Sequence, residues 1–292
     1  MLSISRKSAS AARIILCGLV FAVATSLSTE LVSALGLAMI SVPEGVNRQV
    51  MALASLLVSP LLPLALAPLA ARMAGGFAVR SASLALFAYA AHGLNTMIEA
   101  RIFSTMVGPG ALAGMCVFYI LPCLALGLAV AAAFPARDAR PAPVPRRSAA
   151  AWAGRFVIAW LAFPLAYLFF GMLISPLVID PYRQGVAGLA LPPMSVILAT
   201  QLGRSLLFLG SVLPLVLLWS GAWRPLAVRL GWAWWVLVGL YGLSTAFWMP
   251  PNLRLVHSLE IGADSFVHAF LLVWALRAPS RRAAAAVSRP AA

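Results

Sequence analysis

The sequence predicts an all-α fold, a polytopic bundle of about eight transmembrane helices with both termini in the cytoplasm. Composition excludes an ordinary soluble domain: 63% of the 292 residues are hydrophobic and only 10% are charged, whereas soluble chains carry about a quarter charged residues. The pattern agrees with the composition. Eight apolar runs, each near the roughly 20 residues that a membrane span requires, alternate with short polar segments. The partner implied by this composition is the lipid bilayer.

Residues 1–135 hold the first four predicted spans. The first apolar run, from Ile14 to about Ile40, follows a basic N-terminus and resembles a signal peptide cleaved near Ala24, but it continues beyond the usual length of such a region. We expect an uncleaved span, with cleavage as the alternative. Three prolines should bend the second span. The remaining runs of this half are Val50–Ala71, Ser81–Phe103 and Ala111–Phe134.

Residues 136–151 are rich in Pro, Ala and Arg and should form a cytoplasmic linker. Residues 152–277 hold the last four spans, and the tail at 278–292 is expected to be disordered. The segment from Ser175 to Arg183, with Pro176 and Pro181, should break the fifth span near its outer end, because proline lacks the N–H that a helix needs; a simple kink at Pro176 is the alternative. The four spans of this half are Phe156–Ile179, Met194–Trp219, Gly231–Met249 and Leu255–Leu276.

The distribution of charge predicts the orientation. The net charge is +14, from 21 basic and 7 acidic residues; cytoplasmic loops of membrane proteins collect Arg and Lys, so no nucleic-acid partner is expected. Because only one basic residue is lysine, we expect a bacterial source and a multi-pass inner-membrane location. With the N-terminus inside, 16 basic residues lie on the inner side: Arg6, Lys7, Arg13, Arg72, Arg80, Arg137, Arg140, Arg146, Arg147, Arg155, Arg224, Arg229, Arg277, Arg281, Arg282 and Arg289.

Ionisable groups inside two spans are the candidate site. Such groups cost about 2.5 kcal/mol or more each in a membrane and therefore tend to mark function. In the eighth span, helical periodicity places four polar groups on one narrow face: His257, Glu260, Asp264 and His268. In the third span the same spacing aligns His92, Asn95 and Glu99.

The two polar faces should meet. The spans run antiparallel, and a rise of about 1.5 Å per residue puts their carboxylates at matching depth in the outer half of the membrane, with imidazoles near the midplane. We therefore expect the third and eighth spans to contact each other. Arg204, in the sixth span, needs a carboxylate partner if it is buried; Glu99, Glu260 and Asp264 are available.

Three mechanisms are compatible with a polar lining of this kind. A proton- or ion-coupled transporter needs carboxylates and imidazoles in a cavity, and its substrate would be a proton, a cation or a small molecule. A metal-dependent intramembrane hydrolase needs His and carboxylate ligands, with zinc as the candidate cofactor, but the sequence has no H-E-x-x-H motif. A structural or assembly protein needs only satisfied polar pairs. We favour the transporter over an enzyme and assign no catalytic residue.

Overall fold

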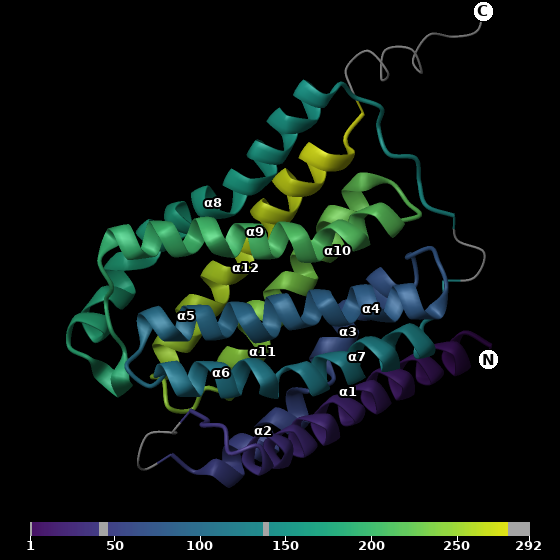
Figure 1. The fold of residues 1–292 in the computed structure, drawn as a ribbon. Coiled ribbons are helices and arrows are strands. Elements are labelled where there is room, and N and C mark those ends of the chain that lie inside the picture. The colour runs from purple at the N-terminus through teal and green to yellow at the C-terminus, as the bar shows by residue number, and fades with distance from the viewer. Residues whose placement is uncertain (1, 41–45, 137–139, 280–292) are drawn as a thin grey trace, which may run out of the picture.

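The computed structural model describes residues 2–40, 46–136 and 140–279 (Figure 1). The described part is all-α, apart from two isolated bridges between loops. Its helices are α1 (Leu2–Ala34), α2 (Arg48–Val58), α3 (Leu61–Ala70), α4 (Phe77–Ala88), the π-helix η1 (Tyr89–Leu94), α5 (Asn95–Phe103), α6 (Pro109–Phe118), α7 (Ile120–Ala133), α8 (Ala149–Arg183), the 3-10 turn η2 (Val186–Gly188), α9 (Met194–Leu218), α10 (Trp223–Trp234), the π-helix η3 (Trp235–Leu240), α11 (Tyr241–Thr245) and α12 (Pro251–Arg277).

Seven helical segments of the described chain are long and apolar enough to cross a membrane. Their outer surfaces suit lipid: Leu57, Leu165 and Leu173 each expose more than 60% of their surface. The segment Phe77–Phe103, the third predicted span, is not among the seven. It carries several polar residues and is largely enclosed by other helices. The chain is therefore a multi-pass α-helical membrane protein; the count of eight and the location of the termini stay predictions.

Eight of the described helices pack as a closed ring. In order of contact around it lie α1, α7, α4, α9, α8, α12, α10 and α3, which packs back against α1. The members from residues 1–135 form one continuous arc and those from 152–277 form the other. The expected direct packing of the third span on the eighth is not the principal arrangement. The third span lies between α7 and α9 and the eighth between α8 and α10, so the two are not neighbours in the ring.

Serine hydroxyls compensate for four prolines within this ring. A proline has no N–H, so the carbonyl four residues earlier loses its helical donor, and an unpaired carbonyl is costly inside a membrane. In each case a serine supplies the missing donor: Ser59 Oγ to Leu56 O (2.8 Å) before Pro60, Ser28 Oγ to Phe118 O (2.5 Å) before Pro122, Ser205 Oγ to Trp160 O before Pro164, and Ser175 Oγ to Met172 O (3.0 Å) before Pro176.

This compensation corrects one prediction. The break expected between Ser175 and Arg183 is absent, because α8 runs through Pro164, Pro176 and Pro181 as one helix to Arg183. The hydroxyl of Ser175 donates to the Met172 carbonyl that Pro176 releases, so this carbonyl is satisfied without a break in the helix. The second span is interrupted where its first proline lies, since α2 and α3 are separate helices that meet at Ser59 and Pro60.

Arginines close the end of the bundle where α1 begins and α12 ends, which we call the arginine end. There Arg147 donates to the Leu276 carbonyl of α12 at 3.0 Å, and Arg80 donates to the Ala70 carbonyl of α3 at 2.9 Å. Cations suit helix C-termini, where carbonyls lack donors. Arg277 also donates to Ala142 O at 3.1 Å. The described part of the linker is therefore irregular but attached, and the tail from residue 280 lies outside the described residues.

Candidate functional site

A partly open cavity of about 820 Å³ extends into the bundle, and its volume is within the range of small-molecule sites. Its wall begins at loop residues opposite the arginine end, among them Met106 and Leu191, and reaches Phe208 and Trp234 in the middle of the bundle. Most of the wall is apolar and aromatic. The cavity therefore lies within the membrane-spanning part of the molecule.

Seven of the eight candidate residues line this one cavity: His92, Glu99, Arg204, His257, Glu260, Asp264 and His268. The eighth, Asn95, is fully buried and binds Arg204. The faces predicted for the third and eighth spans thus look into shared space and do not pack directly on each other. Polar groups at membrane depth avoid lipid by facing protein or a cavity, and here the cavity takes that role.

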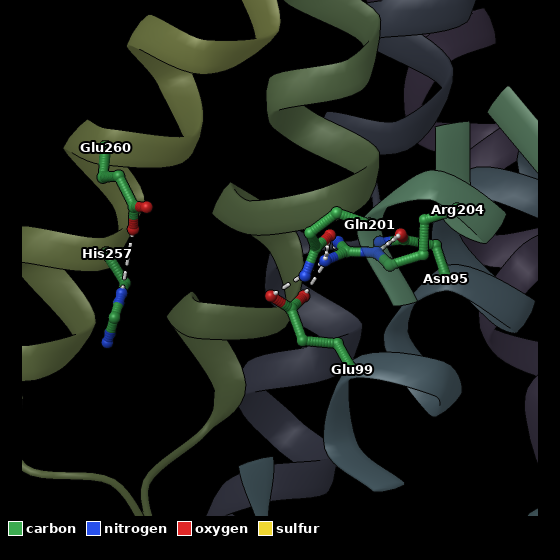
Figure 2. A network of polar contacts seen from close by, with 6 residues as sticks. All are labelled: Asn95, Glu99, Gln201, Arg204, His257 and Glu260. Carbon is green, nitrogen blue, oxygen red and sulfur yellow. Dashed lines mark hydrogen bonds and ion pairs between the residues drawn. The ribbon is translucent and has the colours of Figure 1, made fainter. Parts of the chain in front are cut away.

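Arg204 ties α9 to α5 through a network of polar contacts (Figure 2). Its Nη2 lies 3.3 Å from Glu99 Oε2 in an ion pair, and its Nε and Nη1 donate at 2.7 Å to Asn95 Oδ1 and Gln201 Oε1. The guanidinium also lies 5.1 Å from the ring centroid of Phe163. The expected carboxylate partner of Arg204 is therefore Glu99. Gln201, on the same face of α9, completes the set of acceptors.

A second polar chain crosses from α8 to α12. The Tyr182 hydroxyl lies 3.1 Å from His257 Nε2, and His257 Nδ1 lies 3.0 Å from Glu260 Oε2 (Figure 2 shows the last pair). All three line the cavity. An imidazole held at both nitrogens can accept a proton at one and release it at the other. Helical periodicity did not identify Tyr182 as a site residue, because no spacing rule relates the end of α8 to the start of α12.

Asp264 and His268 continue the same face of α12 toward the middle of the bundle. Asp264 is 7% exposed and His268 2%. Asp264 Oδ1 and His268 Nε2 are buried without a hydrogen-bond partner in the described structure. The His268 ring stacks on Trp234, with centroids 4.3 Å apart and planes 13° apart. These two groups retain hydrogen-bonding capacity that the protein itself does not use.

His92 joins the two π-helices. It belongs to η1, and its Nδ1 lies 3.1 Å from the carbonyl oxygen of Leu237 in η3. The rings of Tyr119 and Tyr241 pack edge-on against the imidazole at 5.2 and 5.1 Å. Single π-helical turns recur at functional sites because they displace a helix from its regular register. Here they bring the third and seventh spans together beside the cavity.

The geometry gives little support to a metal centre. Among the described residues, no group of three or more His, Cys, Asp and Glu side chains is arranged to hold a metal ion. Comparison with protein-family models, curated proteins and solved structures found no match. The chemistry of the cavity is therefore the basis for a functional proposal.

Proposed function

We propose that the protein is a proton-coupled small-molecule transporter of a bacterial inner membrane. The observation that carries the proposal is a line of proton-transfer groups along the cavity: Tyr182, His257 and Glu260 are in hydrogen-bonded sequence, and Asp264 and His268 follow on the same face of α12. Carboxylates and imidazoles in series inside a membrane are the groups that pumps and transporters use as proton relays.

The order of these groups suggests a route. Tyr182 lies at the end of α8 remote from the arginine end, and His257 connects it to Glu260. Asp264 follows Glu260 after one helical turn, a rise of about 6 Å. A proton crossing that gap needs a bridging water or a substrate group. Such a gap suits coupling, because the occupant of the cavity then governs whether the proton passes.

The alternatives are supported less well. A purely structural protein would satisfy its buried polar groups, as the Arg204 network mostly does, but Asp264 Oδ1 and His268 Nε2 are not satisfied. A metal-dependent hydrolase needs several protein ligands around one ion, and the described residues offer no such group. The cavity and the unpaired polar atoms of its lining, Asp264 Oδ1, His268 Nε2 and Trp234 Nε1, favour reversible binding of a substrate.

Proteoliposomes test the proposal. A potassium diffusion potential, negative inside, would drive proton entry, which a trapped pH-sensitive dye reports while organic cations, amino acids and sugars are supplied one at a time. At least one class should evoke proton entry with the wild-type protein. Glu260→Gln and Asp264→Asn should abolish that response, because each removes an ionisable group from the route. Asp180→Asn is the matched control, since that side chain is 73% exposed.

Insertion and folding of every variant would be checked by its elution as a single species in detergent. The proposal fails if no class of substrate evokes proton entry, or if Glu260→Gln and Asp264→Asn both transport at the wild-type rate. Loss of the response in Asp180→Asn as well would point to general damage and would also count against the route.

A further inference from the structure

The charge of the cavity is opposite in sign to that of the chain. The chain carries +14. Among the described residues that line the cavity, the carboxylates are Glu99, Glu260 and Asp264 and the only cation is Arg204. Three negative charges against one positive charge give the lining a formal charge of −2 with neutral histidines. Such a lining attracts cations and repels anions.

Asp264 is the acid in this lining that has no protein partner in the described structure. Glu99 is paired with Arg204, and Glu260 is paired with His257. Asp264 is more than nine-tenths buried, and its Oδ1 has no hydrogen bond. A buried carboxylate is costly as an anion unless a cation pairs with it. Asp264 is therefore the carboxylate of this wall that is left for a ligand to pair with.

Aromatic faces lie beside this carboxylate. One turn along α12, His268 packs among Trp234, Phe163 and Phe208, at 4.3, 5.3 and 5.8 Å between ring centroids. The same wall already holds a cation, because the guanidinium of Arg204 lies 5.1 Å from the Phe163 centroid. Aromatic faces bind organic cations through the ring quadrupole, and quaternary ammonium groups are the usual ligands of aromatic cages.

Methionine makes the rest of the wall adaptable. Eight of the ten methionines in the chain line the cavity: Met39, Met51, Met97, Met106, Met115, Met172, Met194 and Met249. Flexible, polarisable thioether side chains fit ligands of varied shape and recur at promiscuous binding surfaces. A small inorganic ion such as Ca²⁺ would need six or more oxygen ligands. The wall suits a bulky apolar molecule that carries one positive charge.

We propose that the cavity binds bulky lipophilic organic cations, with Asp264 as the counter-charge and the aromatic residues around His268 as the face on which the cation rests. This inference specifies the substrate class of the proposed transporter and in that respect rests on it. Binding itself requires only the cavity and Asp264, so it can be measured without transport.

The test compares two ions of nearly the same shape and opposite charge. Tetraphenylphosphonium and tetraphenylborate would be titrated into the purified protein in non-ionic detergent and measured by equilibrium dialysis against protein-free micelles. The cation should bind saturably, and the anion should bind about tenfold more weakly or worse. Asp264→Asn should weaken binding of the cation by about tenfold or more, because a charge-assisted contact is lost. Asp180→Asn should bind like the wild type.

A second variant tests the cavity without changing its charge. Gly171 of α8 lines the cavity, and a Cβ there would lie 3.7 Å from Glu260 Oε1. Gly171→Leu should fill part of the space and weaken binding of the cation. A leucine favours the helix more than glycine does, so the variant should fold. Gly203→Leu is its control, because nothing lies within 4 Å of a Cβ at Gly203.

Equal binding of the two ions, or unchanged binding of the cation in both Asp264→Asn and Gly171→Leu, would overturn the inference. Saturable, Asp264-dependent binding without proton-coupled uptake would support the inference and contradict the proposed transporter. Proton-coupled uptake of sugars or amino acids without binding of the cation would do the reverse.

Discussion

Replacing Arg204 with methionine should destabilise the protein by about 3 kcal/mol. Removing one member of a buried ion pair costs about 3–5 kcal/mol, because the remaining charge is left without a partner. The Arg204 side chain is 2% exposed, but that of Glu99 is 30% exposed, so the remaining carboxylate can turn toward the cavity. That relief favours the lower limit of the range. Asn95 and Gln201 each also lose a donor at 2.7 Å.

Glu99→Gln should cost less, about 2 kcal/mol, because a neutral amide oxygen can still accept a hydrogen bond from the guanidinium. In the double variant neither charge is left unpaired. Its loss should therefore be smaller than the sum of the two single losses by about 1 kcal/mol or more. The exposed pair Asp180 and Arg183, at 3.9 Å with side chains 73% and 62% exposed, is the control and should be additive within about 0.3 kcal/mol.

The free energy of unfolding would be measured by titrating the protein from mild detergent into mixed micelles that contain dodecyl sulfate, with helical circular dichroism as the signal. Each variant would be compared with the wild type at the same mole fraction of dodecyl sulfate. Additive losses for Arg204→Met and Glu99→Gln would refute the argument that the two residues form one energetic unit.

Three further predictions follow from other parts of the fold. Reporter fusions at Arg140 and after Ala292 should both be cytoplasmic, because most basic residues lie on that side; a periplasmic signal from either would contradict the orientation. Ser205→Ala should cost about 1 kcal/mol by freeing the Trp160 carbonyl, whereas in the Pro164→Ala background, where the restored backbone N–H supplies the donor, the same change should cost little. Gly127→Leu should cost about 3 kcal/mol or more by overpacking, because a Cβ there would lie 2.6 Å from the Ala85 backbone nitrogen; equal stability of Gly127→Leu and Gly203→Leu would be inconsistent with close packing of α4 on α7.

The length of the apolar runs, helical periodicity and charge balance predicted most of the membrane segments and the charged and histidine side chains of the cavity. Apolar length defined the membrane segments, because each run must cross the same thickness of hydrocarbon. Helical periodicity aligned His257, Glu260, Asp264 and His268 on one face, and all four line the cavity. A buried arginine needs a carboxylate partner, which predicted an ion pair for Arg204, and the structure pairs it with Glu99. Each of these predictions depends on residues within one helix or on a rule of charge balance.

The sequence did not predict which helices are neighbours. The order around the ring depends on close packing between segments far apart in the chain, as where Gly127 meets Ala85. For the same reason the hydrogen bonds of Ser28 and Ser205 to carbonyls on other helices were not foreseen. Proline alone predicted a break in α8, but the neighbouring hydroxyl of Ser175 kept the helix intact.

The eight candidate residues are of similar chemical types, but they differ in whether the protein pairs their polar groups. In the Arg204 network the polar groups pair with one another, apart from the side-chain amide nitrogens of Asn95 and Gln201. Substitutions in this network should therefore change the free energy of unfolding more than the affinity for a ligand. Asp264 has no such partner, and its replacement with the isosteric asparagine removes a charge that the protein leaves unpaired. A buried, unpaired charge opposes folding, so Asp264→Asn should stabilise the ligand-free protein while weakening binding of an organic cation. Changes of opposite sign in these two measurements are expected of a functional group and not of a structural one.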